Sequence, residues 1–549
     1  VTDRIGLTLP ADCFDGRPHG FSVRLVSPPT LIGDCVTATP VASPPLTPTG
    51  RPSWPTKDQS LTYGAKARYE ALHAGLEHWW REHRGAVDLG PAQTNLLGQL
   101  LEVHDRVIAG PDPTLRNHPS LSFPDVPEPV VSIVVPCHNQ FHYTYHCLAS
   151  LLLARTEVAF EVVVVDDGSS DQTQTLEQLV TGIRVIRHDT AQGFVAAVNA
   201  GAAVARGKYV LPLNNDVEVL SRWLDELLWP FTAMQDVGMS GARLLYPDGR
   251  LQEAGGVIWG DGEAWNYGRG GNAEDPRYTY TRQVDYLSGA CILVPKALWN
   301  ELGGFDTAFA PAYYEDTDLA FRIRERGLKT IYAPLSRVIH FEGASNGTST
   351  DSGIKRHQAL HAPLFRRKWF ERYRQHSKDR LRVDQEKDRG VYLRALLIDA
   401  QTPTPDHDAG SYAAVQEMRL LQSLGFKITF APQSLMHGGV HTQDLQRMGV
   451  ECLYAPFVTS LAQLLQQRGE EFDLVYATRY NVAEQVVDLV RRHAPRAKLV
   501  LNNADLHFLR ELRAAMAAGD AKLKERAFAT RDAELAVMRK VDLVLSYST

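Results

Sequence analysis

Cysteine is scarce in this sequence, and its few cysteines are scattered. The six show no C-x-x-C pair and no spacing typical of metal ligands: Cys13, Cys35, Cys137, Cys147, Cys291 and Cys452. Secreted domains that depend on disulfides are short and dense in cysteine. The pattern argues against a disulfide framework and favours reduced, buried cysteines in a cytoplasmic protein.

Long apolar runs and an excess of one charge are also missing. No apolar segment approaches the roughly 20 residues that span a bilayer, and the N-terminus lacks the pattern of a signal peptide. The 58 basic and 64 acidic residues give a formal net charge of −6. This balance gives no electrostatic reason to expect nucleic acid as a partner.

Several nucleotide-binding and hydrolase motifs are absent as well. No predicted strand is followed by a glycine-rich dinucleotide fingerprint, and there is no P-loop, no G-x-S-x-G and no H-E-x-x-H. The run Gly268–Gly271 lacks the strand–turn–helix context and is predicted to be a mobile loop. A dinucleotide oxidoreductase is therefore disfavoured, and a phosphate ligand would be held by a metal ion.

Length and composition predict a globular protein of several domains. Hydrophobic residues make up 44% and charged residues 22% of 549 residues, which is too long a chain for one ordinary core. Because the sequence starts at Val1 and closes on a strand that looks cut short, we expect a fragment. The predicted parts are an extended segment (1–60), a helical region with a proline-rich linker (61–127), an α/β domain (128–372), a linker (373–390) and an incomplete Rossmann-like α/β unit (391–549).

Strands and helices alternate from residue 131 onward. The β-branched run 131–135 is a predicted buried strand, and 141–154 is a predicted helix. This order predicts a parallel, mostly doubly wound sheet, whose ligands bind beyond the carboxyl ends of the strands. The other predicted elements are strand 161–165, helix 171–180, strand 183–187, helix 194–205 and strand 209–213, then strands 394–398, 427–430, 474–477, 499–501 and 543–545 in the last unit.

Two aspartates, Asp166 and Asp167, follow the second strand. Carboxylates at a strand end can accept hydrogen bonds from the imide N–H of uracil or thymine and from ribose hydroxyls. The alternative is a turn whose Ser169 or Ser170 caps the next helix. Both interpretations can hold together, with Ser170 capping and Asp167 binding.

A second polar motif, Asn214-Asn215-Asp216-Val217-Glu218, follows the fourth strand. Asp216 and Glu218 alternate in an extended segment, so we expect them on one side as oxygen ligands for Mg²⁺ or Mn²⁺ bound to phosphate. An Asx-turn is the alternative. His340 follows a further strand and is a candidate third ligand, although a lone histidine is more often structural.

Three carboxylates, Glu315, Asp316 and Asp318, precede a predicted helix that ends at Gly327. They could simply stabilise the helix dipole at its N-terminus. The functional interpretation is that one of them takes a proton from an acceptor hydroxyl, which requires a carboxylate held in a cleft.

Taken in order, these motifs resemble the family-two glycosyltransferases over residues 131–370. The Asn-Asn-Asp form is similar to rhamnosyltransferase-like members that build bacterial O-antigen and related polysaccharides. Ala191 departs from the usual Asn, and Asn214 replaces a common Asp. The matching pieces are Pro136-Cys137-His138-Asn139, Val165–Ser169, Gly193-Phe194 with Asn199, Leu213–Asp216, Gly303–Asp306, Glu315–Leu319 with Arg322, and His340.

The resemblance implies a GT-A fold and an inverting, metal-dependent transfer with Mn²⁺ or Mg²⁺. The donor would be a dTDP- or UDP-linked sugar, and the acceptor a hydroxyl of a glycan or lipid-linked glycan in cell-surface polysaccharide synthesis. Asp316 would be the catalytic base, Asp167 would contact the nucleobase, and Asp216 with His340 would hold the metal. The other expected substrate-binding residues are Pro136, His138, Asn139, Asp166, Gly193, Asn214, Asn215, Gly289, Ala290 and Glu315.

Three further interpretations remain open. The last unit resembles the N-terminal half of a GT-B glycosyltransferase, through Asp408–Ser411, Leu424–Phe426 and Asp505–Glu511. The chain could instead be a catalytically weak carbohydrate-binding or scaffold subunit, because Asn214 weakens the metal motif. Cations and aromatics in Phe365–Phe370 suggest peripheral contact with the inner face of the cell membrane, against the alternative of a closing helix.

Overall fold

The computed structural model describes residues 19–21, 36–38, 102–103, 106–107, 110–114, 118–342, 356–503 and 505–546. The chain divides into two compact units, which we call the first unit (Trp54–Arg389) and the second unit (Val1–Ser53 with Gly390–Thr549). Most of the predicted extended segment (1–60), and most of the part of the predicted helical region (61–127) that precedes residue 110, lies outside the described residues.

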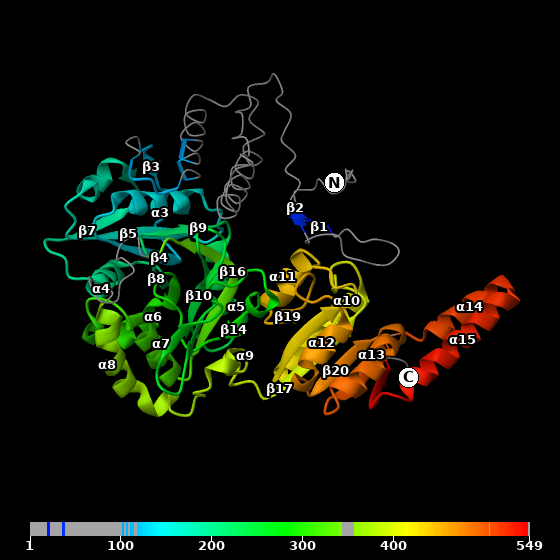
Figure 1. The fold of residues 1–549 in the computed structure, drawn as a ribbon. Helices are drawn as coiled ribbons and strands as arrows, with labels where there is room; N and C mark the ends of the chain where they lie inside the picture. The colour runs from blue at the N-terminus through cyan, green and yellow to red at the C-terminus, as the bar shows by residue number, and fades with distance from the viewer. Residues whose placement is uncertain are drawn as a thin grey trace, which may run out of the picture. The chain divides into compact units, whose positions relative to one another are not determined.

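A ten-stranded mixed sheet is the centre of the first unit (Figure 1). Its path runs β14-β16-β10-β15-β8-β4-β5-β7, with β11 beside β10 and β9 beside β16. The strands are β4 (Val131–Cys137), β5 (Phe160–Asp167), β7 (Arg184–His188), β8 (Tyr209–Pro212), β9 (Val217–Val219), β10 (Val237–Leu245), β11 (Leu251–Glu253), β14 (Arg282–Gln283), β15 (Ile292–Pro295) and β16 (Lys329–His340).

The half of the sheet built from β8, β4, β5 and β7 is parallel. Antiparallel pairing begins where β15 joins β8 and β10, so the predicted α/β sheet is confirmed as mixed and mainly parallel. Among the described residues, three short pairs lie outside it: β1 (His19–Phe21) with β2 (Val36–Ala38), β3 (Leu121–Ser122) with β6 (Val180–Thr181), and β12 (Gly256–Ile258) with β13 (Ala264–Asn266).

Helices pack on both faces of this sheet and create two hydrophobic cores. One core takes residues from α3 (Phe141–Leu153) and α5 (Trp223–Ala233). The other takes residues from α4 (Phe194–Val204), α6 (Lys296–Leu302), α7 (Glu315–Glu325) and α8 (Arg356–Tyr373). The short helices are η2 (Gln172–Gln178), η3 (Pro276–Tyr278), η4 (Thr307–Phe309), η5 (Arg380–Arg382) and α9 (Val383–Glu386).

The helix predicted over 171–180 is instead the short 3₁₀ helix η2, interrupted by non-helical geometry at Thr175. Its cap is Asp171, not Ser170: the Asp171 carboxylate accepts the Thr173 N–H at 3.0 Å and the Phe141 N–H at 2.9 Å. One carboxylate therefore fixes the starts of both η2 and α3.

The last residues of the first unit pack against its body. Arg389 donates to both carboxylate oxygens of Asp285 at 2.5 and 2.8 Å, and Arg324 of α7 approaches Asp285 at 3.2 Å. These cations hold the pKa of the buried Asp285 below its usual range against the effect of burial. The segment 373–390, which the sequence suggests is a linker, thus contributes a buried ion pair to this unit.

The second unit is built on a six-stranded parallel sheet in the order β19-β18-β17-β20-β21-β22. In chain order this is 3-2-1-4-5-6, the arrangement of doubly wound sheets. The strands are β17 (Leu393–Asp399), β18 (Phe426–Pro432), β19 (Glu451–Cys452), β20 (Leu474–Thr478), β21 (Lys498–Asn503) and β22 (Leu543–Ser546). The sequence missed β19, which has only two residues.

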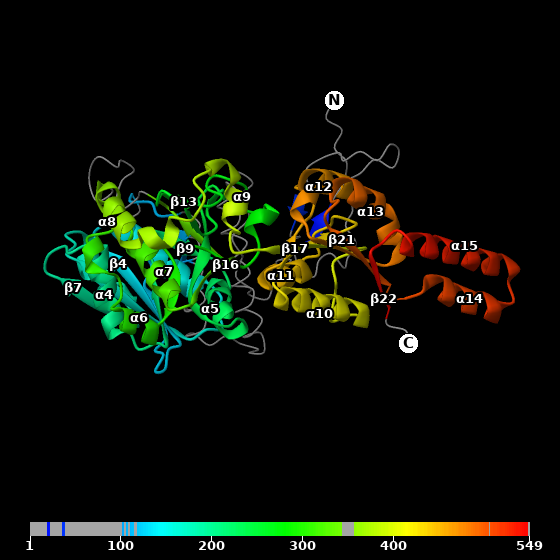
Figure 2. The ribbon, with the colours of Figure 1, turned by 90° about the horizontal axis from the view of Figure 1, so that it is seen from below.

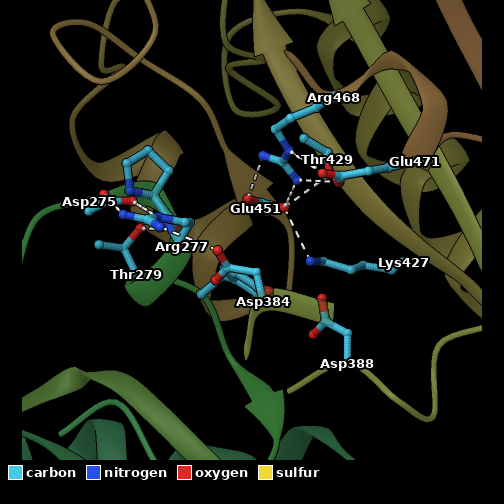
Figure 3. Close-up of polar contacts among 12 residues, drawn as sticks. Asp275, Arg277, Thr279, Asp384, Asp388, Lys427, Thr429, Glu451, Arg468 and Glu471 are labelled. Carbon is cyan, nitrogen blue, oxygen red and sulfur yellow. Dashed lines mark hydrogen bonds and ion pairs between the residues drawn. The ribbon is translucent and has the colours of Figure 1, made fainter. Parts of the chain in front are cut away.

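Six α-helices and the short η6 (Gly469–Glu471) complete this unit: α10 (Ala409–Ser423), α11 (Val440–Arg447), α12 (Leu461–Arg468), α13 (Tyr480–His493), α14 (His507–Ala518) and α15 (Ala521–Met538). Helices α14 and α15 lie side by side (Figure 2), joined through Gly519 at φ 64° and capped by Asp520. At the sheet edge, buried Glu451 binds Lys427 at 3.2 Å and Arg468 at 2.8 Å (Figure 3).

The described residues include four of the six cysteines and the basic, aromatic segment of α8. Cys137, Cys147, Cys291 and Cys452 are buried and unpaired. Within the described residues, no helix is long and apolar enough to cross a membrane. In the basic, aromatic segment of α8, Phe365 and Trp369 are buried in the core, whereas Phe370 is exposed.

A buried carboxylate, Asp318, attaches α8 to α7. Its oxygens meet Arg322 Nε at 2.7 Å, Trp369 Nε1 at 2.8 Å and Lys368 Nζ at 2.7 Å, and the residue has no exposed surface. Three donors from two helices therefore converge on one carboxylate, which is a structural use of the third acidic residue in the Glu-Asp-x-Asp motif.

We expect Asp318→Ala to lower the free energy of unfolding of the first unit by about 3–5 kcal/mol, because it leaves buried donors without an acceptor. All nine tryptophans precede residue 390, so tryptophan fluorescence during urea unfolding follows this unit. The matched control is Glu325→Ala, which removes an exposed α7–α8 pair to Arg372 and should cost less than about 1 kcal/mol. Equal losses in the two variants would contradict this role of Asp318.

Candidate active site

A cavity of about 720 Å³ opens in the first unit. Its walls come from segments that follow β8 and β10, from the loop before β15, from the start of α7 and from the end of β16. Lining residues used below are Asn214 and Asp216, Gln252 and Glu253, Trp265–Arg269, Ser288–Ala290, Tyr313–Thr317, and His340 with Glu342.

The turn Ser288–Ala290 connects three parts of this cavity through its backbone. The Ser288 N–H donates to Glu253 Oε1 at 3.0 Å, and the Gly289 N–H donates to Asp316 Oδ2 at 2.8 Å. The Ala290 carbonyl accepts the Asn214 N–H at 3.0 Å. Residues that are distant in sequence are therefore held in one rigid arrangement.

Asp316 lies in the first turn of α7 and is half-buried at the cavity wall. The two residues before the helix, Tyr313 and Tyr314, adopt left-handed φ angles of 77° and 72°, a strained backbone for residues with side chains. Besides Gly289, the Asp316 carboxylate accepts the Thr317 N–H at 2.6 Å. Burial raises the pKa of Asp316, while these backbone donors oppose the shift.

Two more carboxyl groups, Glu253 and Glu315, border Asp316. Burial raises the pKa of Glu253 to about 8, with a further contribution from the charge of Asp316. The pKa of Glu315 is also raised well above its ordinary value, by burial first and then by Asp316. Glu253 Oε2 and Glu315 Oε2 are buried and have no hydrogen-bond partner in the part of the chain that the structure describes. Neutral forms of these neighbours favour ionised Asp316.

Asp216 and His340 meet at the opposite side of this arrangement. Asp216 Oδ1 lies 3.3 Å from His340 Nε2, and Asn214 Nδ2 lies 3.4 Å from the same nitrogen. Asn214 Oδ1 is buried and lacks a hydrogen-bond partner among the described residues. Two oxygens and one imidazole nitrogen suit Mn²⁺ or Mg²⁺, so the donor set fits the divalent metal suggested by the sequence.

Glu218 does not reach this cavity, contrary to the expectation that it faces the same side as Asp216. Its carboxylate is buried, with Oε2 at 2.8 Å from Nε2 of His146 in α3. Asn215 and Asp216 form a turn before β9 begins at Val217. Side chains two residues apart point to the same side only within a strand. Since Asp216 lies in the turn and Glu218 in the strand, this rule does not place them on one side.

The orientation of His340 is fixed by a chain of side chains that the sequence did not reveal. His340 Nδ1 donates to Gln252 Oε1 at 2.8 Å, and Gln252 Nε2 donates to Glu342 Oε2 at 3.1 Å. Arg269 also donates to Glu342 at 2.8 Å, so the glycine-flanked loop predicted to be mobile carries a lining residue. Although burial lowers the pKa of His340, the nearby Asp216 carboxylate outweighs it and the net shift is upward.

A second group of predicted residues gathers at the carboxyl ends of β4 and β5, outside the lining of the cavity. The Asp167 carboxylate accepts the Gln192 N–H at 2.9 Å and the Gly193 N–H at 2.7 Å, and it meets His188 Nδ1 at 2.7 Å. Asp167 therefore shapes the loop before α4. Gly193 has φ 93°, and a Cβ there would lie 2.4 Å from Pro311 Cβ, so only glycine fits.

The neighbours of Asp167 are engaged in the same region. Asp166 accepts the Ser169 N–H at 2.9 Å, and His138 Nδ1 donates to the Asp167 carbonyl at 2.7 Å. Asn139 Oδ1 accepts the Ser170 N–H at 2.8 Å. Pro136 lies within β4, and Asn215 donates to Thr144 of α3 at 2.9 Å.

The cavity brings together about half of the site residues that the sequence predicts. Those that line it are Asn214, Asp216, Gly289, Ala290, Glu315, Asp316 and His340. Those that do not are Pro136, His138, Asn139, Asp166, Asp167, Gly193, Asn215 and Glu218.

Aromatic residues and arginines complete the cavity, and no motif in the sequence pointed to them. Arg277 lies between Asp275, at 2.8 Å, and Asp384 of α9, at 3.3 Å (Figure 3). Flat aromatic faces beside polar groups are typical of pockets that take polar ligands with apolar faces. The aromatic lining residues are Phe194, Trp265, Tyr267, Tyr278, Tyr286, Tyr313 and Tyr314.

Comparison with known proteins agrees with the resemblance read from the motifs. Residues 132–293 match the family described as glycosyl transferase family 2. The uncharacterized protein y4gI of Sinorhizobium fredii is 30% identical over 234 residues, 40% of this chain and 25% of that protein. The O-antigen biosynthesis protein RfbC of Myxococcus xanthus is 33% identical over 226 residues, 40% of this chain and 18% of that protein.

A third relative, N-acetylglucosaminyl-diphospho-decaprenol L-rhamnosyltransferase of Mycobacterium tuberculosis, is 28% identical over 251 residues, 42% of this chain and 81% of that protein. The match thus spans a quarter or less of the first two relatives and most of the third. Residues 132–293 therefore form a glycosyl transferase family 2 domain, and the sequence-based identification of this domain is confirmed.

The raised pKa of Glu253 predicts a pH-dependent stability that one substitution should reduce. Between about pH 5 and 8 the native carboxyl keeps a proton that the unfolded chain has released, so raising the pH lowers the free energy of unfolding. One such group contributes up to roughly 1.4 kcal/mol per pH unit. Glu253→Gln keeps an oxygen for the Ser288 N–H but cannot titrate.

We therefore expect the unfolding free energy of Glu253→Gln, followed by tryptophan fluorescence in urea at several pH values, to fall less steeply with pH than that of the wild type. The control is Glu301→Gln at an exposed glutamate, whose slope should match the wild type. Parallel slopes for wild type and Glu253→Gln would show that the buried carboxyl is not protonated in this window.

Proposed function

We propose that the first unit transfers a sugar, with inversion, from a nucleoside diphosphate donor to a hydroxyl of a glycan or lipid-linked glycan. The observation that carries this proposal is the joint position of Asp316 and the Asp216–His340 pair in one cavity, linked by the Ser288–Ala290 turn. The similarity to the RfbC and rhamnosyltransferase relatives supports a role in cell-surface polysaccharide synthesis.

Asp216, His340 and Asn214 Oδ1 are the residues that would hold Mn²⁺ or Mg²⁺. When bound, such an ion neutralises the charge that develops on a leaving diphosphate. The residues themselves supply orientation: Gln252 accepts from His340 Nδ1 and so directs the Nε2 lone pair of neutral His340 toward Asp216. A partner on the far nitrogen of this kind commonly orients metal-ligating histidines.

Asp316 is the proposed base. Its raised pKa makes it a stronger base than an exposed aspartate, and neutral forms of Glu253 and Glu315 allow it to remain ionised. The acceptor hydroxyl would lose its proton to this carboxylate while its oxygen attacks the anomeric carbon opposite the nucleotide. The bond to the diphosphate breaks in the same step, which inverts the anomeric centre.

The group at the ends of β4 and β5 is the proposed nucleoside site. Asp166, Asp167, His138, Asn139 and Gly193 surround the loop that Asp167 fixes. A carboxylate has about four acceptor positions. Three donors, from Gln192, Gly193 and His188, already use Asp167, so one position remains for a uracil or thymine imide N–H. We therefore propose a dTDP- or UDP-linked donor. We also propose that the chain makes peripheral contact with a membrane and that the second unit is GT-B-like.

We expect Asp316→Asn to lower kcat about 10²–10⁴-fold, because the amide cannot accept the hydroxyl proton, while nucleotide binding persists.

Asp216→Ala should instead abolish the Mn²⁺-dependent shift of the melting temperature with nucleoside diphosphates. A nucleotide at 100 times its Kd adds roughly 2.7 kcal/mol of stability, enough for a thermal-shift screen of dTDP, UDP and GDP with and without Mn²⁺.

Two outcomes of this experiment would overturn parts of the proposal. Full turnover by Asp316→Asn would remove Asp316 from the base role. No shift with any nucleotide, and no donor hydrolysis, would favour a carbohydrate-binding or scaffold subunit that keeps the fold without turnover.

Gln252→Ala should weaken Mn²⁺ binding to the chain about 10–100-fold, because His340 loses the partner that orients its ring. Electron paramagnetic resonance of free Mn²⁺ measures this affinity without any need for turnover. Gln358→Ala is the matched control, since Gln358 is an exposed lining residue of the same cavity. Equal affinities for wild type and Gln252→Ala would show that His340 needs no such support.

A further inference from the structure

A cluster of metal-ligating side chains lies in the second unit, apart from the residues used above. Asp406 and His407 belong to the loop after β17, and His441 lies in the first turn of α11, in the segment after β18. Strands β17 and β18 are parallel neighbours, so the two loops emerge at the same edge of the sheet. One ligand atom from each residue lies within 4.8 Å of the others.

The separations within this cluster match a metal coordination shell better than hydrogen bonds. Asp406 Oδ2 is 3.5 Å from His407 Nε2, and Asp406 Oδ1 is 3.6 Å from His441 Nε2. Both exceed the usual hydrogen-bond range of about 2.7–3.2 Å. A tetrahedral shell with metal–ligand bonds of roughly 2.1 Å places neighbouring ligands roughly 3.4 Å apart, close to these values.

The two imidazole rings do not stack on one another. Their centroids are 5.9 Å apart and their planes meet at 82°, while the Nε2 atoms of both rings approach the same carboxylate. The ligand atoms therefore converge on one region from different directions, as donors around an ion must.

Local contacts hold the two loops in place. His407 N–H donates to the Thr404 carbonyl at 2.9 Å, which closes a turn, and Asp408 caps α10 by accepting the Ser411 N–H at 2.8 Å. In the other loop, Gly438 N–H donates to Thr442 Oγ1 at 2.8 Å. Gly438 packs so closely on Thr402 that an added Cβ would lie 2.8 Å from its Cβ, which joins the two loops.

We propose that Asp406, His407 and His441 bind one divalent transition-metal ion of the zinc class. Two imidazole nitrogens and one carboxylate oxygen are ligands that favour Zn²⁺, Co²⁺ or Ni²⁺ over Mg²⁺ and Ca²⁺. The side chains of Asp406 and His407 are 61% and 71% exposed, so coordination positions stay open to water or to a ligand oxygen. Ligands of doubly wound sheets bind at this carboxyl edge.

The test uses the full chain, free of any affinity tag, with Asp216→Ala to silence the proposed donor-site metal. Titration with Zn²⁺ by calorimetry and with Co²⁺ by visible absorption should show one saturable site. His441→Ala, and separately His407→Ala, should weaken binding by more than about 100-fold, since loss of a ligand exceeds the 10–100-fold effect of losing a supporting contact. His493→Ala in α13 of the same unit should bind as the parent does.

A gain of signal complements these losses. His407→Cys replaces one ligand by a thiolate and should keep the site while adding a near-ultraviolet charge-transfer band in the Co²⁺ spectrum. Because His407 is exposed, its replacements leave the core intact, which unfolding curves would verify. Absence of saturable binding, or binding that survives both histidine-to-alanine changes, would overturn the proposal and leave the cluster as polar contacts between two loops. Neither outcome depends on the transferase activity proposed for the first unit.

Discussion

The candidate active site depends on the backbone of one turn, Ser288–Ala290. Two consecutive N–H groups of this turn hold the carboxyls of Glu253 and Asp316, and its last carbonyl holds the chain at Asn214. The turn leads directly into β15, which joins the parallel and antiparallel parts of the sheet. Three segments that are distant in sequence are thereby attached to one turn beside a central strand, which is how a fold limits the cost of orienting side chains.

Burial of three carboxyls around this turn is unfavourable for stability. Removing a carboxyl from water favours its neutral form. Because Oε2 of Glu253 and Oε2 of Glu315 have no hydrogen-bond partner among the described residues, that penalty is only partly offset. Asp316 differs because two backbone N–H groups and the Thr317 hydroxyl support its charge. The environment of Asp316 therefore differs from that of its two neighbours, and the base role proposed for Asp316 rests on this difference.

The two groups of predicted site residues play different structural parts. The carboxylate of Asp167 is almost fully used in folding the loop before α4, whereas Asn214 Oδ1 is buried and has no hydrogen-bond partner in the part of the chain that the structure describes. The proposed metal centre in the first unit is buried and supported through Gln252 and Glu342. The cluster in the second unit is exposed and supported by loop contacts, so the chain offers two different environments for ions.

The sequence by itself determined the succession of strands and helices, the family 2 domain, the positions of Asp167, Asp216 and His340 at or after strand ends, and the position of Asp316 at the start of a helix. These follow from local patterns, because periodicity and turn residues act over a few neighbours. Only the tertiary structure decided that Glu218 pairs with His146 instead of joining Asp216, since a turn breaks the alternation between them. It also decided that Glu253 and Gln252 belong to the site and that His407 meets His441. Such contacts join residues far apart in the chain, and no local pattern records which distant side chain a sheet will place beside another.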